Sequence, residues 1–264
     1  MKNLQALILI SFAMILVTGS CVSRKKLAYL QYSGATDNFD INSGENYTSI
    51  TPAAYKVMAY DNLFIRVVTP DPQWSAIFNI MPVGAGGAVT EESAGLFGYT
   101  VDVEGFIEIP FVGEVKVAGK TLNEIKVELD SVFRDYVADA AITVRLVNNY
   151  VSIIGEVSRP GRYLLTKERV NIFEALAMAG DMIDFSNRYR VQLIRPSPYG
   201  PVVKELSLAD RSILSSEFYY IMPNDIIYTI PLKGKSFRIN SSVWTLFLST
   251  ITSALGVIAF FRTL

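Results

Sequence analysis

Hydrophobic and polar residues follow clear periods over the middle of the chain, between about residues 55 and 231. Short apolar or alternating runs predict strands, whereas apolar residues three and four positions apart predict helices. The expected strands are 63–68, 99–103, 106–110, 111–117, 141–146, 151–157, 162–165, 191–194, 202–206 and 226–230. The pattern therefore predicts an α+β protein that is rich in short strands.

Turn signals separate these runs. Glu104-Gly105 stands between 99–103 and 106–110, so we expect those two runs to pair as a hairpin. Residues 69–98 carry several Pro and Gly residues and no sustained period, which predicts a long excursion from the sheet.

Two helices have clear start signals. Thr121 and Glu124 have the spacing of a capping box, as do Asn171 and Glu174. Gly180 follows the second helix, where a glycine commonly ends one. The first helix carries a stripe of five residues that should pack on a sheet: Leu122, Ile125, Leu129, Phe133 and Tyr136. Strands followed by a helix occur twice, so we expect two folded blocks, 53–148 and 149–232.

The N-terminus reads as a processing segment. Lys2 precedes the apolar run 6–17, and the small residues 18–20 stand directly before Cys21. This order is typical of a signal peptide, and the apolar core is too short to span a bilayer. Cys21 is the only cysteine of the 264 residues. We therefore expect cleavage after residue 20 and lipid on Cys21; the alternative is an ordinary signal peptide with a chance cysteine.

Residues 33–52 are rich in Ser, Gly, Asn, Asp and Thr, which predicts a flexible lipidated tether over 21–52. The basic residues 24–26 suit anionic lipid head groups, although a soluble linker explains them nearly as well.

A second apolar segment closes the chain. No charged residue occurs from 239 to 261, and residues 243–261 would form a helix of roughly 28 Å. We expect a transmembrane helix over 239–262, with a buried core helix as the alternative. Small or weakly polar residues share one face of it, which predicts packing against copies of the helix unless the arrangement is chance: Thr245, Ser249, Thr252, Gly256 and Ala259.

Composition excludes several kinds of chemistry. Net charge is −1, which argues against a nucleic-acid surface. The chain has no histidine and no second cysteine, so His-based catalysis, Cys-His pairs and zinc-type sites are excluded. No pair of carboxylates is marked for glycan hydrolysis. We expect no enzyme activity, no metal and no cofactor.

The ordered motifs resemble the outer-membrane polysaccharide export lipoproteins, the Wza-like family. The first block is similar to the polysaccharide export domain, and the second to the soluble-ligand-binding β-grasp (SLBB) module. The matching residues in the first block are Tyr55, Asp61, 63–65, 101–102, Gly105, 109–110, Gly113 and 117–121. Those in the second block are 154–157, 160–161, Tyr163, Ala175, 179–180 and 222–228, with Asn224 where Gly is more frequent.

The resemblance implies an oligomeric ring with its folded blocks in the periplasm, held at the outer membrane as a conduit for capsular or extracellular polysaccharide. It also implies docking on an inner-membrane polysaccharide co-polymerase. The motif residues are expected to be structural, at turns and close backbone contacts: Asp61, Gly105, Pro110, Gly113, Gly155, Pro160, Gly161 and Asp225. One β-grasp module, where larger members have more, predicts a shorter ring. The alternative is a periplasmic lipoprotein that binds a small soluble ligand through the β-grasp module.

Overall fold

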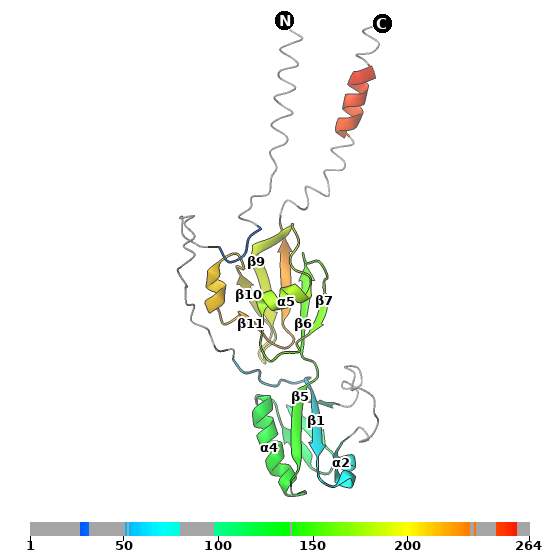
Figure 1. Ribbon diagram of the computed structural model, residues 1–264, viewed down its shortest axis with the longest axis vertical. Helices are drawn as coiled ribbons and strands as arrows, with labels where there is room; N and C mark the ends of the chain where they lie inside the picture. Colours follow the sequence, from blue (N-terminus) through cyan, green and yellow to red (C-terminus); the bar gives the residue numbers. More distant parts are fainter. Residues whose placement is uncertain are drawn as a thin grey trace.

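The computed structural model describes residues 27–31, 51, 53–79, 98–137, 139–232, 235 and 247–257. Figure 1 shows two folded units, one above the other along the longest axis, with a short helix beyond the second unit. The predicted signal peptide and Cys21 lie outside the described residues.

Over its described residues, the first unit contains one antiparallel sheet, one hairpin and two helices. Its elements are β1 (Asn62–Val68), α2 (Pro72–Phe78), β2 (Tyr99–Thr100), β3 (Phe106–Ile109), β4 (Gly113–Lys116), α4 (Leu122–Arg134) and β5 (Ala141–Leu146). The sheet has the order β2-β1-β5, and α4 packs against β5. Both bonds of the capping box at Thr121 and Glu124 are present. Ile125, Leu129 and Phe133 are fully buried, as the stripe predicts.

The hairpin predicted between 99–103 and 106–110 is wrong. β3 pairs instead with β4, from Phe106 opposite Lys116 to Ile109 opposite Gly113. β2 ends at Thr100 because its partner strand starts only at Asn62, after Tyr60 has turned the chain with φ at 68°.

The region predicted as an excursion contains helix α2. Asp71 caps it through a bond from the Gln73 amide, and Pro72 occupies the first turn, where its missing N–H costs nothing. An Asp-Pro pair before an apolar run is the start signal that the Pro and Gly content obscured.

The second unit is built on a five-stranded mixed sheet of order β10-β9-β12-β6-β7. Its elements are β6 (Tyr150–Gly155), β7 (Gly161–Leu164), β8 (Val170–Asn171), α5 (Ile172–Met178), β9 (Ser186–Arg195), β10 (Val202–Leu206), η2 (Arg211–Ser215), β11 (Tyr220–Ile221) and β12 (Ile226–Pro231). β12 runs parallel to β6 and antiparallel to β9. The capping box at Asn171 and Glu174 is complete, and Gly180 follows α5 with φ at 74°.

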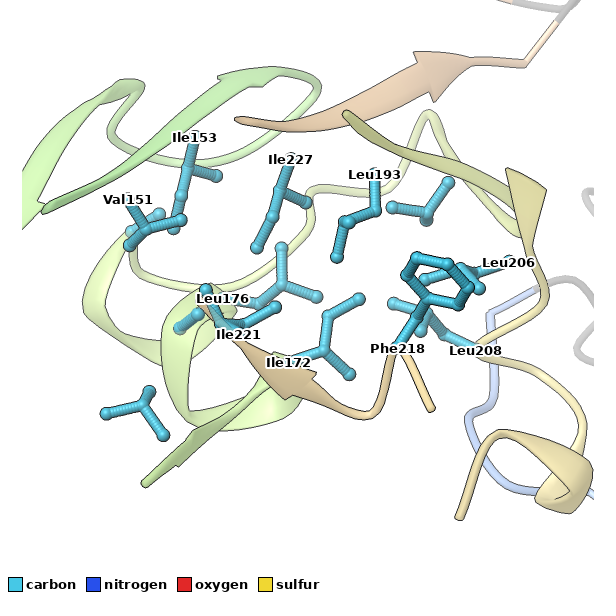
Figure 2. Close-up of a cluster of buried hydrophobic side chains, with 14 of the residues drawn as sticks. Val151, Ile153, Ile172, Leu176, Leu193, Leu206, Leu208, Phe218, Ile221 and Ile227 are labelled. Carbon is cyan, nitrogen blue, oxygen red and sulfur yellow. The ribbon is translucent and has the colours of Figure 1, made fainter. Parts of the chain in front are cut away.

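Each unit has its own core. Figure 2 shows the core of the second unit, where α5 and β11 face the sheet. Ile153, Leu193 and Ile227 from three neighbouring strands meet Ile172 and Leu176 of α5. The core of the first unit is separate and runs from Val57 to Ile142.

The C-terminal prediction is corrected. Among the described residues, no helix is both long and apolar enough to cross a membrane. The described part of the predicted 239–262 helix is residues 247–257, and the rest of that range lies outside the described residues. The structure therefore does not support a membrane-spanning helix here. Thr245 and Ala259 of the predicted packing face lie outside the described residues.

Candidate functional site

The motif carboxylate of the first unit, Asp61, is buried and surrounded by neutral donors. Its side chain accepts from the Tyr55 hydroxyl at 2.7 Å, the Met58 amide at 2.8 Å and the Asn148 amide group at 2.9 Å. Asp61 therefore closes the turn that leads into β1 and ties it to the chain leaving β5. Its acceptors are used within the fold, which does not suit a sugar ligand or a general base.

The motif carboxylate of the second unit, Asp225, is also fully buried, but it faces a cation. Arg195 of β9 donates to both of its oxygens, at 3.0 and 2.8 Å, and the Met222 amide adds a third bond at 2.8 Å. Burial raises the pKa of the Asp225 carboxyl, and the Arg195 guanidinium and the Met222 amide offset part of that rise because they favour the carboxylate.

Tyr55 connects the two carboxylates across the junction of the units. Its side chain bonds to Asp61 in its own unit and to Asn224 in the second unit. Asn224 has φ at 64°, and its backbone N–H donates to the Tyr150 carbonyl at 2.7 Å. Burial raises the pKa of the Tyr55 hydroxyl above its ordinary value, and the negative charge of Asp61 adds to the rise. Asp61 and Asp225, distant in sequence, thus lie around one tyrosine.

Two motif glycines are required by packing. Gly105 has φ at 88°, and a side chain there would overlap Ala118, while its carbonyl accepts from the Val117 and Ala118 amides. Gly155 has φ at 96°, and a side chain there would overlap the carbonyl of Thr229 on β12. Both positions exclude any residue larger than glycine.

The remaining motif residues lie at turns. Gly113 has φ at 89° with open space around it. Gly161 has no positive φ, and a Cβ atom added there would lie 3.7 Å from the Tyr163 ring. Pro110 begins the turn from β3 to β4, and Pro160 directly precedes β7.

The comparisons with known proteins concern mainly the first unit. Residues 49–147 match the family described as polysaccharide biosynthesis/export protein. The matched region covers less than half of the chain, and we name it the export domain after the family that it resembles. The resemblance inferred from the motifs is thereby confirmed for this part of the chain.

Two relatives of the export domain are named as export proteins. The chain is 37% identical over 86 residues to the EPS I polysaccharide export outer membrane protein EpsA of Ralstonia nicotianae. It is 31% identical over 102 residues to the protein of the same name from Ralstonia solanacearum. These alignments cover 31% and 37% of this chain, and 23% and 27% of those proteins. The alignments thus span about a quarter of the length of the relatives.

The export domain also carries an exposed aromatic surface that the sequence did not predict. Phe78 of α2 is buried, and four rings surround it: Trp74, Phe111, Phe133 and Tyr136. Phe111 is 72% exposed. Its backbone has φ at 68°, an uncommon conformation for a bulky residue. Figure 1 places α2 at the end of the export domain away from the second unit. The missed signal was α2 itself, because Trp74 and Phe78 are neighbours one helical turn apart on one face of it.

No cluster of metal ligands occurs among the described residues. Both predicted carboxylates, Asp61 and Asp225, instead already have partners within the fold. This arrangement favours a structural role for them over catalysis.

Proposed function

We propose that the chain is a non-catalytic outer-membrane lipoprotein that assembles into an oligomeric conduit for capsular or extracellular polysaccharide. The observation that carries the proposal is the export domain at residues 49–147, whose relatives are named as polysaccharide export outer membrane proteins. The paired carboxylates support it, since they provide no acid–base couple.

The second unit would act as a β-grasp (SLBB-like) module that joins the export domain to the outer membrane. Its mixed sheet around one helix suits that fold. At the C-terminus, Ser249, Thr252 and Gly256 would contact neighbouring copies. The Thr252 hydroxyl already bonds to the Leu248 and Ser249 carbonyls, so this face needs no polar partner for it.

The test is export in a strain that lacks the gene and carries either the wild-type chain or one cut after residue 240. We expect wild type to restore surface polysaccharide and to run as a ring-sized oligomer in detergent. The truncated chain should fold and be lipidated, but fail in both. A strictly monomeric complex, or unimpaired export without residues 241–264, would contradict the conduit and favour a periplasmic lipoprotein that binds a small ligand.

The inner-membrane co-polymerase would dock on the aromatic surface of Trp74, Phe111 and Tyr136. Exposed aromatic clusters are typical of protein interfaces. Truncation of one central ring costs about 2 kcal/mol or more of binding free energy, which corresponds to a loss of about 30-fold in affinity. We expect Trp74→Ala and Phe111→Ala to reduce recovery of the co-polymerase at least tenfold after cross-linking in cells. The control is Tyr189→Ala, because Tyr189 is an aromatic residue on the second unit that is about as exposed as Trp74. Undiminished recovery with both variants would place the docking surface elsewhere.

A further inference from the structure

Residues 27–31, here named the strap, pack against the second unit although the whole export domain separates them in sequence. The Leu30 amide donates to the Leu208 carbonyl at 3.1 Å, and the Gln31 amide to the Ala209 carbonyl at 2.6 Å. The strap thus lies beside the chain that follows β10. This differs from the free tether expected over 21–52.

Side chains secure the strap in the same place. The Tyr29 ring lies edge-on to Phe173 of α5 with centroids 5.7 Å apart, and the Arg188 guanidinium lies over it at 4.8 Å. The Tyr29 hydroxyl donates to Asp181 at 2.6 Å. One tyrosine therefore makes an aromatic, a cationic and a hydrogen-bonding contact with three different parts of the second unit.

Arg188 explains why the strap needs an aromatic ring at this position. Only 6% of Arg188 is exposed, and its buried Nε and Nη1 atoms have no hydrogen-bond partner among the described residues. Its Nη2 donates to the Met182 carbonyl at 3.1 Å. A buried cation that lacks a carboxylate partner is costly, and the electron-rich face of Tyr29 offsets part of that cost.

A further bond fixes the direction of the strap. Arg211, at the start of η2, donates its Nε to the Leu30 carbonyl at 2.9 Å. Gln31 also forms a parallel bridge with Asp210, so the strap runs in the same direction as the chain that enters η2.

The strap changes how far the lipid anchor lies from the folded protein. Leu27 is six residues after Cys21, a reach of at most about 20 Å in an extended chain. Ala53 is 32 residues after Cys21, so a chain that was free as far as Ala53 would have a reach of about 110 Å. Docking of the strap therefore shortens the free chain between Cys21 and the folded protein roughly fivefold. The folded part that is brought close to Cys21 is the second unit and not the export domain.

The C-terminal connection leaves from the same end of the second unit. Lys235 forms an ion pair with Glu156, whose side chain is almost completely buried, and the Leu232 amide donates to the Phe185 carbonyl at 2.7 Å. Figure 1 shows the blue strap and the end of β12 at the end of the second unit that lies away from the export domain.

From these contacts we propose that the strap clamps the lipidated N-terminus to the second unit, so that the end of this unit carrying the strap and η2 lies against the lipid surface. The export domain then points away from that surface. This inference rests on the lipid at Cys21 in the proposed function, but not on export.

A disulfide tests the docking of the strap. Lipidation consumes the thiol of Cys21, the only cysteine, so an engineered pair reports without background. Gln31→Cys with Asp210→Cys joins the two residues of the parallel bridge. We expect most of the full-length protein from cells to carry this disulfide, and at least tenfold less when Tyr29→Ala is added. Tyr29→Phe, which keeps the ring, should retain it, and Gln31→Cys with Gln73→Cys should not form one.

Energy transfer tests the orientation. Ser212→Cys in η2 and Gln73→Cys in α2 are both exposed and are labelled singly with a donor dye. The full-length protein is then placed in phosphatidylglycerol–phosphatidylethanolamine vesicles that contain an acceptor-labelled lipid. We expect several-fold more transfer from position 212 than from position 73, and a ratio that falls towards one with Tyr29→Ala.

The outcomes separate the parts of the inference. A disulfide that is absent, or that is unchanged by Tyr29→Ala, would overturn the docking of the strap. Equal transfer from the two positions would overturn the orientation. A Cys21 thiol that still reacts with maleimide would overturn the lipid anchor on which the inference rests. Neither readout depends on polysaccharide export, so loss of export alone would count only against the proposed function.

Discussion

The export domain and the second unit each bury one motif aspartate, but they satisfy it by different means. Asp61 of the export domain accepts from three neutral donors, whereas Asp225 receives both bonds of the Arg195 fork. A carboxylate held by neutral groups loses one bond when one donor is removed. A carboxylate that is paired with a single cation becomes an unpaired buried charge when that cation is removed. The second unit should therefore be the more vulnerable of the two to a single substitution.

The sharpest test is Arg195→Met. Asp225 has no exposed surface, so its charge would remain buried without a cation, which costs about 3–5 kcal/mol. Hydrogen exchange measured by mass spectrometry should show loss of protection across β9 and β12, with the export domain unchanged.

Arg190→Met is the matched control on the same strand. Arg190 pairs with Glu205, but both side chains are about half exposed, so the loss should be at most about 1 kcal/mol. Adding Asp225→Asn to Arg195→Met should restore part of the lost protection, because the unpaired charge is then gone. Equal effects of Arg190→Met and Arg195→Met would contradict the comparison.

Substitution of one glycine in each unit tests the comparison of the two units further. Gly155→Ala would drive a methyl group into the Thr229 carbonyl, so we expect a loss of about 3 kcal/mol or more from backbone displacement and positive φ together. Gly113→Ala in the export domain has positive φ but open space, and should cost only about 1 kcal/mol. Denaturant midpoints of the full chain would rank the two, and a reversed order would contradict the packing at Gly155.

Asp61→Asn should have a smaller effect than Arg195→Met. The new NH2 group would face either the Tyr55 hydroxyl and the Met58 amide, which donate to the same oxygen, or the Asn148 amide group, which donates to the other. Either orientation leaves a mismatch worth about 1–3 kcal/mol. Protection of β1 and β5 should fall in hydrogen exchange. Tyr55→Phe removes only one donor and should cost about 1 kcal/mol. A larger loss with Tyr55→Phe than with Asp61→Asn would show that the contact with Asn224 dominates the junction.

The smallest effect concerns pH, and it should be alike in the two units. Bonds from the backbone amides of Thr121 and Asn171 lower the pKa of Glu124 and of Glu174, respectively. A lowered folded-state pKa gives stability that is present above the ordinary glutamate value and is lost as pH falls below that value, through the lowered folded-state value. Glu124→Gln and Glu174→Gln should flatten that part of the stability profile. A profile that stays equally steep in both variants would mean that other carboxylates dominate it.

Local signals in the sequence predicted much of this fold. The capping boxes at Thr121 and Asn171, and the strands Ala141–Leu146 and Val202–Leu206, were foreseen because each depends on neighbours in sequence. The pairing of β3 with β4 was missed because Tyr60, a residue with positive φ and no glycine signature, ends the ladder of β2.

The site was foreseen only in part. Asp61 and Asp225 were expected to be structural residues at turns, and in the structure they accept from the Met58 and Met222 amides. Their common neighbour Tyr55 and the fork of Arg195 depend on tertiary contacts that no local pattern encodes. The strap was missed for the same reason, since Tyr29 looks like any tether residue until Arg188 and Phe173 are brought beside it.

The parallel pairing of β6 and β12 also determines how the second unit would respond to tension. The chain enters at Tyr150, beside the export domain, and leaves past Pro231 at the opposite end. A pull between these points slides the two strands along each other. The Ser152 and Glu156 amides, bonded to the Asp225 and Thr229 carbonyls, would then be strained together and not one after another. Such shear loading resists rupture far better than unzipping, so the second unit is arranged as a mechanical coupling between its two neighbours.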